Sequence, residues 1–324
     1  MNTTLPTDSQ QLLYSEVYIG IAILLTIIPV VGFFENSAVI FVFYNNRQLR
    51  TPCNLYITGL AICDILHCTI GIPMVTASAY AKQWIFGQKG CTYYGFVTTF
   101  LGITQITILT VIAFDRYESL HGEYVLKYKS FIKPYVKILV ACYCHGFVWA
   151  FFPLVGWSSF KMDATRLSCC INWMSQSPLD MSYLLSLTFF GYIIPVVSIA
   201  VSYCAICLAL RRRARSAMFP NNISATDRIF NLEKYVTITV FLIVAFFLVS
   251  WTPYAIVIIV SALGKPKALY TYGTTLPGIF AKCSTIWNPI IYVIRNSKFR
   301  RCLIMTFSRM SCRENSTTRS SWPC

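Results

Sequence analysis

The chain has 324 residues, of which 56% are hydrophobic and only 12% charged, and its mean hydropathy is +0.58. Soluble domains carry about 25% charged residues, so this composition excludes an ordinary soluble enzyme. The formal net charge is +15. Because the basic residues are divided among short segments between apolar runs, we expect contact with a lipid bilayer and no nucleic-acid binding.

Apolar runs long enough to cross a membrane recur along the chain. We predict seven spans, at about 17–43, 54–79, 92–113, 135–157, 182–210, 235–262 and 273–294. No polar linker divides them, so we predict an all-α membrane protein built as one seven-transmembrane helix bundle. The predicted parts are an extracellular tail at 1–16, the transmembrane domain at 17–294, and a cytosolic segment at 295–324 that starts with a short amphipathic helix.

The placement of lysine and arginine predicts the orientation of the bundle. Nineteen basic residues lie in the loops on one side and the tail, and only six lie on the other side. Loops rich in Lys and Arg remain in the cytosol. We therefore expect a multi-pass protein of the plasma membrane with an extracellular N-terminus and a cytosolic C-terminus. No basic region of the kind that starts a cleaved signal peptide is visible at the N-terminus.

One charge stands alone in the seventh predicted span. Lys282 lies between Lys267 and Arg295, the nearest charged residues on either side. An ammonium at the centre of a membrane helix costs about 2.5–3.5 kcal/mol on insertion scales. A buried amine is also easily deprotonated and is then a nucleophile that forms Schiff bases. Lys282 therefore predicts a covalently bound aldehyde cofactor inside the bundle.

The cysteines fall into groups with different expectations. Within spans we expect them to act as small apolar packing residues: Cys63, Cys68, Cys142, Cys144, Cys204, Cys207 and Cys283. On the oxidising outer side we expect one disulfide from Cys91 to the second outer loop, where Cys169 and Cys170 are both candidates. Cys312 is a candidate palmitoylation site, with an unmodified thiol as the alternative. Asn2 begins a sequon on the outer side and is a candidate for glycosylation.

Several motifs resemble those of class A G-protein-coupled receptors. Asp115-Arg116-Tyr117 closes the third span, and Asn288-Pro289-Ile290-Ile291-Tyr292 closes the seventh. Further matches are Asn36, Leu49-Arg50-Thr51-Pro52, Asp64, Trp251-Thr252-Pro253, and Pro195 with Tyr203. Within that family, a lysine seven residues before the proline of the last span is typical of the opsins, which attach retinal to it. The residues around Lys282 and Cys91 most resemble the peropsin, retinochrome and neuropsin branch.

The resemblance implies how a charged retinal linkage on Lys282 would be neutralised. Vertebrate visual opsins have a glutamate at the position of Tyr94, and tyrosine is neutral at pH 7. Asp163, six residues after Trp157, matches the counterion of bistable opsins, and Cys169 then matches the loop cysteine of the disulfide. We expect Asp163 to be the counterion and Tyr94 its hydrogen-bonding neighbour. The alternatives are a solvated loop acid and an ordinary interfacial aromatic.

The resemblance also predicts an apolar retinal pocket. Trp251 and Tyr254 are three residues apart on the sixth helix and share a face, and Pro253 is expected to kink that helix. The predicted lining residues are Trp251, Tyr254, Gly102, Thr188, Gly191 and Tyr192. For each aromatic, packing in the protein core is the alternative. Either 11-cis or all-trans retinal fits this expectation, and no metal site is expected.

The cytosolic half carries residues that the family uses for signalling. Arg116 is flanked by Asp115, and Glu233, expected to open the sixth helix, matches an acid that clamps this arginine in the off state. The predicted coupling and switch residues are Asp115, Arg116, Tyr117, Tyr203, Glu233, Asn288, Pro289 and Tyr292; the predicted intramembrane polar cluster is Asn36, Asp64 and Gln105. The alternative is that the charges only anchor helix ends at the lipid surface. Tyr143 departs from the family, which has tryptophan at that position.

Two functions are consistent with the sequence. The first is a non-visual, light-sensing receptor that activates a heterotrimeric G protein and also interacts with arrestin and a receptor kinase. The second is a photoisomerase that supplies 11-cis-retinal. An isomerase has no need of Arg116, Glu233 or Tyr292, so the receptor is favoured and the chain is not expected to be a conventional enzyme. A receptor for a diffusible ligand would leave Lys282 unexplained.

Overall fold

The computed structural model describes residues 8–121, 133–163, 166–216, 225–262, 275–306 and 308. The chain first forms α1 (Asp8–Asn45), a 3-10 turn η1 (Arg47–Leu49), and a second span made of α2 (Pro52–Leu66), the π-turn η2 (His67–Gly71) and α3 (Ile72–Tyr80). It continues through α4 (Gly87–His121), α5 (Lys133–Phe151) with η4 (Phe152–Leu154), and the strands β1 (Phe160–Met162) and β2 (Cys169–Ile171). The remaining elements are α6 (Pro178–Thr188), the π-turn η5 (Phe189–Ile193), α7 (Ile194–Ser216), α8 (Ala225–Ala262) and α9 (Thr275–Arg295).

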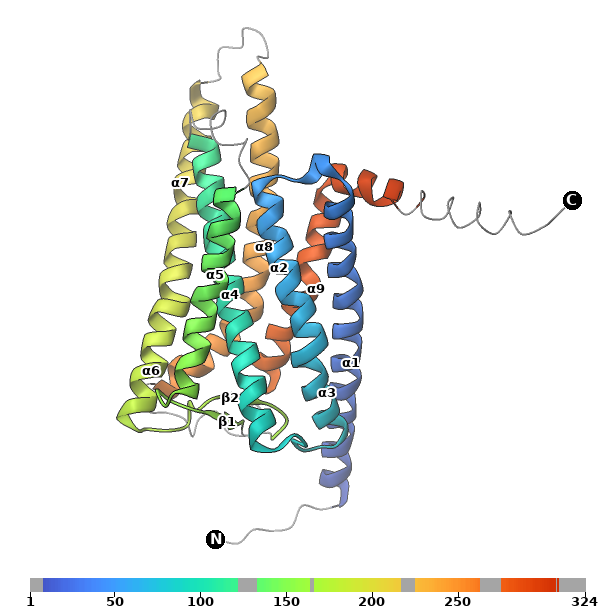
Figure 1. The fold of residues 1–324 in the computed structure, drawn as a ribbon, viewed down its shortest axis with the longest axis vertical. Helices are drawn as coiled ribbons and strands as arrows, with labels where there is room; N and C mark the ends of the chain where they lie inside the picture. The colour runs from blue at the N-terminus through green and yellow to red at the C-terminus, as the bar shows by residue number, and fades with distance from the viewer. Residues whose placement is uncertain are drawn as a thin grey trace, which may run out of the picture.

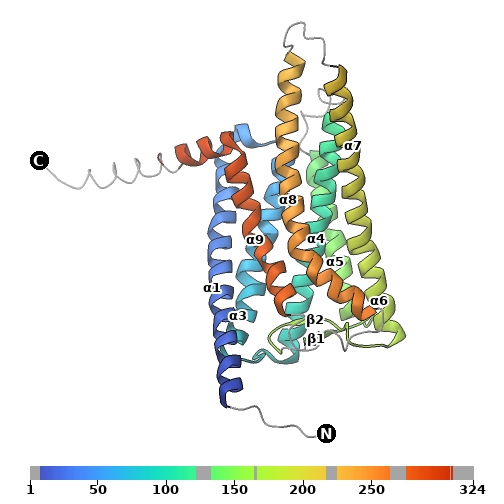
Figure 2. The ribbon, with the colours of Figure 1, turned by 180° about the vertical axis from the view of Figure 1, so that it is seen from behind.

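These elements form one bundle of antiparallel and parallel helices that run between the same two ends (Figure 1). Within the described residues, six helical stretches are long and apolar enough to cross a membrane: 16–45, 52–80, 87–120, 133–154, 178–212 and 233–260. The seventh helix of the bundle is α9, which lies between α8 and α1 (Figure 2). Its polar residues Lys282 and Asn288 reduce its apolarity. The predicted seven-helix membrane fold is confirmed.

The helices begin where the local chemistry favours a start. At the beginning of α2, the Thr51 side chain accepts a hydrogen bond from the Asn54 amide, and Pro52 occupies the first turn. Ser177 does the same for the Asp180 amide at the start of α6, again with a proline following it. Proline is tolerated in the first turn because its missing N–H would have no partner there. Both spans therefore have a defined end.

Two sequence expectations about these helices are corrected by the structure. The sixth helix begins at Ala225, so Glu233 lies two turns inside α8 and does not open it. Cys144, Cys204 and Cys207 do not pack inside the bundle but are exposed on its surface. Apolar residues need not point inward in a membrane protein, because lipid is as apolar as the core. Position within a span therefore did not predict burial.

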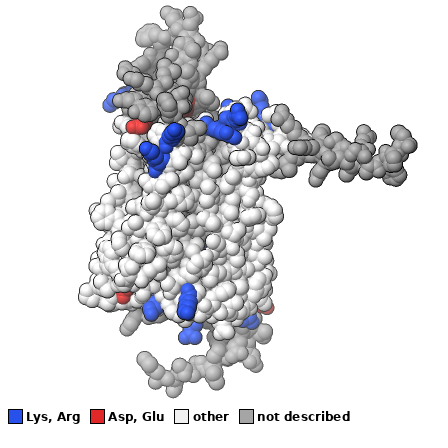
Figure 3. All heavy atoms as spheres, viewed as in Figure 1, with Lys and Arg blue, Asp and Glu red and all other residues white. Residues whose placement is uncertain are grey.

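The surface of the bundle matches a membrane-embedded protein. Large apolar side chains are exposed along its length, including Phe34, Val201 and Val249. In the face shown in Figure 3, lysine and arginine gather near the two ends, and the band between them is almost free of charge. A segment at 297–306 leaves the end of α9 as a further helix (Figure 1). This is the predicted short helix after the seventh span.

Candidate functional site

A cavity lies inside the bundle, beneath the β1–β2 hairpin. The hairpin is antiparallel, pairs Phe160 with Ile171, and crosses one end of the bundle against α4. All six residues predicted to form the pocket line this cavity: Gly102, Thr188, Gly191, Tyr192, Trp251 and Tyr254. Lys282, Asp163 and Tyr94 line it as well. The fold thus brings residues from α4, the hairpin loop, α6, η5, α8 and α9 to one internal space.

The Lys282 amine projects into this cavity from α9. Its Nζ donates one hydrogen bond, to the carbonyl oxygen of Gly278 one turn earlier, at 3.2 Å. A Cβ placed on Gly278 would lie 3.9 Å from Nζ, in ordinary contact, so the glycine leaves the amine some space. An ammonium offers three donors. Within the described part of the chain, two of these donors therefore have no protein partner.

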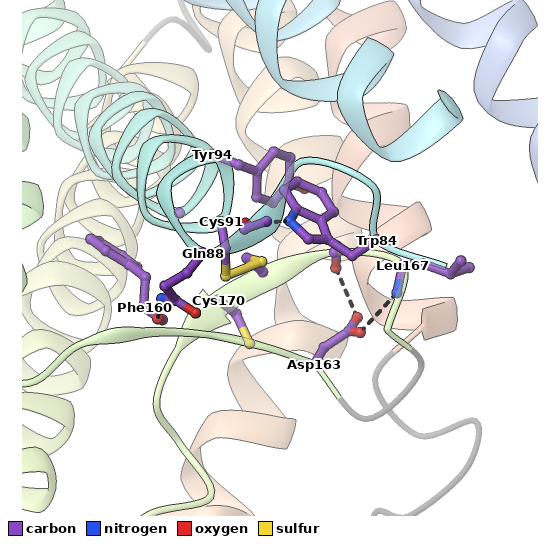
Figure 4. The surroundings of a disulfide bond; sticks show 12 residues. Trp84, Gln88, Cys91, Tyr94, Phe160, Asp163, Leu167 and Cys170 are labelled. Carbon is purple, nitrogen blue, oxygen red and sulfur yellow. Dashed lines mark hydrogen bonds between the residues drawn. A yellow bond between two sulfur atoms is a disulfide. The ribbon is translucent and has the colours of Figure 1, made fainter. Parts of the chain in front are cut away.

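The hairpin loop holds a carboxylate at the cavity wall. Asp163 directly follows β1 and is 9% exposed. Its Oδ2 accepts a hydrogen bond from Ser168 Oγ at 2.8 Å, and its Oδ1 accepts one from the Leu167 amide at 3.3 Å (Figure 4). The carboxylate also interacts electrostatically with the Lys282 amine. Asp163 is therefore a buried acid held in place by its own loop, not a solvated one.

A disulfide anchors this loop to the bundle. Cys91, at the start of α4, is joined to Cys169 in β2, with Cα atoms 5.3 Å apart. The next residue, Cys170, is a free thiol that lines the cavity. Trp173 Nε1 donates to its sulfur at 3.1 Å, and burial raises the pKa of the Cys170 thiol to about 12. Of the two loop cysteines, Cys169 forms the bridge and Cys170 remains a neutral wall residue.

Two tyrosines stand close to Asp163. Tyr94 on α4 is buried and lies edge-on to Trp84 at 5.6 Å between ring centroids. Tyr254 on α8 is hydrogen-bonded to the Cys170 thiol. Both hydroxyls interact electrostatically with the Asp163 carboxylate. Tyr94 is therefore an internal residue near the acid and not an aromatic at the membrane surface.

Trp251 closes the cavity on the side away from the hairpin. Its Nε1 donates to Ser284 Oγ on α9 at 3.2 Å. On α4, a Cβ on Gly102 would lie 2.8 Å from Trp251 Cη2, a distance that requires the ring to move. Trp251 and Tyr254 are 6.3 Å apart between ring centroids. Glycine at 102 is therefore what allows the indole to lie against α4 while it remains tied to α9.

A polar cluster lies deeper in the bundle. Asp64 is fully buried and accepts hydrogen bonds from Gln105 Nε2 at 2.6 Å and from Asn288 Nδ2 at 3.0 Å. Asn36 was predicted to belong to this cluster, but its Nδ2 donates to the backbone oxygens of Gly32 and Thr285. Asn36 thus ties α1 to α9, whereas Asp64 joins α2, α4 and α9.

The opposite end of the bundle holds a buried ion-pair network. Arg116 on α4 is bonded to Asp115, and its Nη1 donates to Glu233 Oε2 on α8 at 2.8 Å. Arg116 and Glu233 are 6% and 7% exposed. Charges that only anchored helix ends at the lipid surface would be solvated, and buried pairs of this kind instead fix the relative position of their helices.

The tyrosines among the other predicted switch residues differ in the contacts that they make. Tyr292 Oη donates to Asn54 Oδ1 at 2.8 Å, and its ring packs against Phe299 at 4.9 Å. Tyr203 is buried, and its hydroxyl has no partner among the described residues. Tyr117 packs beside Phe114 on the same helix, α4. Tyr292 is thus held in place, while Tyr203 has an unused donor.

Some residues of both sites were missed by the sequence analysis. His67 lines the cavity, although it was not singled out. A histidine within an apolar span is a signal that could have found it. On the exposed side of the ion-pair network, Tyr235 Oη donates to the Arg295 carbonyl, and the Arg295 guanidinium lies 4.5 Å from the Tyr235 ring centroid. No sequence pattern indicated that contact. Asn2 and Cys312 lie outside the described residues.

Comparison with known proteins agrees with the fold. Residues 35–292 match the family model of the 7 transmembrane receptor (rhodopsin family). The human visual pigment-like receptor peropsin is 31% identical over 287 residues, which cover 89% of this chain and 84% of peropsin. The G0-coupled rhodopsin of Mizuhopecten yessoensis is 30% identical over 322 residues, covering 98% and 79% of the two chains.

A solved structure extends the same similarity to three dimensions. The crystal structure of squid rhodopsin superposes with a TM-score of 0.83 at 27% identity, and the match covers 91% of this chain and 87% of that one. The chain therefore belongs to the rhodopsin family of seven-transmembrane receptors and, within it, to the opsins.

Proposed function

We propose that the protein is a non-visual light-sensing receptor that binds retinal covalently through a Schiff base to Lys282 and activates a heterotrimeric G protein. The observation that carries this proposal is the pairing of two features in one bundle. An amine with unused donors projects into an apolar cavity at one end, and a buried arginine clamp joins α4 to α8 at the other.

The cavity supports retinal as its occupant. Its walls combine aromatic and aliphatic side chains with glycines at 102 and 191, where added Cβ atoms would lie 2.8 Å from Trp251 and 2.9 Å from Ile103. A polyene aldehyde needs an apolar slot of this kind with one amine at its end. Bound there, retinal would supply light absorption and a change of shape on isomerisation.

The chain's own residues provide the electrostatic setting. The Asp163 carboxylate would stabilise a positive charge on the Lys282 nitrogen, because a nearby opposite charge favours the charged form. The hydroxyls of Tyr94 and Tyr254 interact electrostatically with that carboxylate. The hairpin and its disulfide hold the loop across the cavity, which limits access of water to the linkage.

Signal transfer would run along α8. Trp251, at the cavity, and Glu233, at the clamp, both lie on this single helix. A displacement of Trp251 that moves α8 away from α4 would separate Glu233 from Arg116. The freed guanidinium would then be available to a partner at that end of the bundle. A ligand can shift such an equilibrium only by binding one of the two states more tightly.

The remaining assignments follow from this proposal. The hairpin end of the bundle faces the outside of the plasma membrane, and the Arg116 end faces the cytosol, where the G protein, arrestin and a receptor kinase bind. One relative is named as G0-coupled, which supports a G-protein partner. Asn2 is proposed to be glycosylated and Cys312 palmitoylated.

Light-dependent nucleotide exchange tests the proposal. Purified protein should be loaded with 11-cis and with all-trans retinal, illuminated in membranes, and assayed with a panel of G proteins while the retinal isomers are quantified. We expect light-dependent exchange on at least one G protein. The second function, a photoisomerase, needs only the cavity end. Catalytic release of 11-cis-retinal without exchange on any G protein would replace the receptor by the isomerase.

A further inference from the structure

His67 is a buried base whose position the proposed function does not explain. It begins the π-turn η2 in the second span, where the helix changes register between α2 and α3. The residue is 7% exposed, and its Nε2 has no hydrogen-bond partner within the described residues. Buried polar atoms are almost always satisfied in native structures, so each exception requires an explanation. Isolated π-turns also occur frequently at functional sites.

The imidazole shares the cavity with Lys282. Both side chains line the same internal space, and the amine interacts electrostatically with the imidazole. One turn after His67, Gly71 lacks a side chain, and a Cβ there would lie 3.6 Å from His67 Nδ1 and 3.4 Å from Thr98 Cγ2. The His67 ring and Thr98 of α4 thus both lie next to Gly71.

The charges around His67 can be counted. The elements packed against η2 are α1, α2, α3, α4 and α9. Among the described residues, α1, α2 and α3 contribute no titratable side chain to the cavity wall. The titratable side chains that line the cavity together with His67 are Tyr94 on α4, Asp163 and Cys170 in the loop, Tyr192 on η5, Tyr254 on α8 and Lys282 on α9. Asp64, one turn before His67, is occupied by Gln105 and Asn288. The described wall thus holds one carboxylate and two bases.

One carboxylate balances one positive charge. If both bases were charged in this low-dielectric space, they would repel each other. We propose that the protonation of His67 and that of the Lys282 nitrogen are coupled, so that uptake of a proton by the imidazole disfavours a positive charge on Lys282. For its optical consequence, this inference rests on the proposed attachment of retinal.

The consequence can be measured without retinal. A lysine amine reacts with aldehydes only when it is deprotonated. Retinal-free protein should be treated with formaldehyde and cyanoborohydride at a series of pH values between 5 and 9. The rate at which Lys282 is methylated should then be measured by peptide mass spectrometry. Without the competing base, Lys282 should hold its proton more firmly. We expect His67→Gln to slow methylation three- to tenfold at about pH 6, since a tenfold change corresponds to one pH unit, and to steepen the pH profile.

The chain supplies a matched control. His145 on α5 is also partly buried in the bundle, but its two ring nitrogens are bonded to Thr107 and Trp149, and it does not line the cavity. His145→Gln should leave the methylation profile of Lys282 unchanged. A profile for His67→Gln that matches the wild type at every pH, or an equal effect of both substitutions, would overturn the proposal.

A reciprocal measurement keeps His67 in place and so does not depend on the fold of the His67 variant. In protein with His121→Gln and His145→Gln, ¹⁵N spectra report the one remaining imidazole. Coupling between two sites is mutual, so Lys282→Met should let His67 take up its proton at a higher pH. No change would contradict the coupling. Because both experiments use the retinal-free receptor, failure of retinal to attach to Lys282 would be seen separately.

Discussion

Arg116 Nη1 donates to Glu233 Oε2 at 2.8 Å across 117 residues of sequence, and both side chains are buried. The contact joins α4 to α8 at the end of the bundle opposite the hairpin. Removing one partner of a buried pair leaves the other charge uncompensated. This pair is therefore the element most able to bias the relative position of the two helices.

Glu233→Gln should raise signalling in the dark. Loss of an off-state contact worth about 1.4 kcal/mol raises a small active fraction roughly tenfold. Nucleotide exchange on the responsive G protein, measured in membranes without light, reports this change. Glu118→Gln alters an exposed acid on α4, two residues after Arg116, and serves as the control. Equal dark activity in the wild type and Glu233→Gln would show that the pair does not hold the off state.

Tyr235 forms a second contact between α8 and α9 at this end. Its ring lies 4.5 Å from the Arg295 guanidinium, and its hydroxyl donates to the Arg295 carbonyl. Cation–π contacts at exposed sites contribute about 0.5–1 kcal/mol. Tyr235→Leu should therefore raise dark exchange by about two- to fivefold, and Tyr235→Phe, which keeps the ring, by less. Equal effects of the two substitutions would assign the contact to the hydroxyl alone.

Asp163→Asn should move absorption from the visible to the near ultraviolet at neutral pH. A carboxylate stabilises a nearby positive charge, and the amide keeps its size without the charge. Tyr94→Phe should produce a much smaller change. Ser168→Ala removes a hydrogen bond to Asp163 but not the charge, and is the control for loop geometry. A dominant effect of Tyr94→Phe would reverse the assignment. A wild type that absorbs only in the ultraviolet would show that Asp163 does not act as the counterion.

Tyr143 replaces the tryptophan typical of the family and makes a different contact. Its hydroxyl donates to the carbonyl oxygen of Gly59 at 2.8 Å and links α5 to α2. A hydrogen bond of this kind contributes about 1 kcal/mol. Tyr143→Phe should lower the thermal unfolding midpoint by a few degrees and leave the absorption spectrum unchanged. A spectral shift in this variant would mean that the α2–α5 contact reaches the cavity.

The sequence predicted the number of spans because apolar runs of membrane length are directly visible in it. It indicated Lys282 as a functional residue for a similar reason, because a single charge within an apolar span is easily recognised. It did not predict which cysteines are buried. The lipid-facing and the core-facing sides of a membrane helix are both apolar, so residues such as Cys204 and Cys207 can lie on either side. The pairing of Tyr235 with Arg295 depends on how α8 and α9 pack, and neither residue carries a pattern that indicates its partner.

The choice between the two loop cysteines came from the family resemblance and not from the residues themselves. Cys169 and Cys170 are adjacent and equivalent by composition, and only the match at Trp157 favoured Cys169. The structure explains the choice, because Cys169 lies in β2 opposite Met162 and next to the start of α4. The neighbouring Cys170 remains a free thiol in the cavity wall.

The central claim is that retinal attaches to Lys282, and borohydride trapping tests it most directly. Protein loaded with retinal is reduced, digested and mapped by mass spectrometry. The account predicts retinal on the peptide that contains Lys282, loss of covalent pigment in Lys282→Ala, and normal labelling in Lys137→Ala, which changes a second lysine within the predicted spans. Retinal found on any other residue, or pigment that persists covalently in Lys282→Ala, would contradict it.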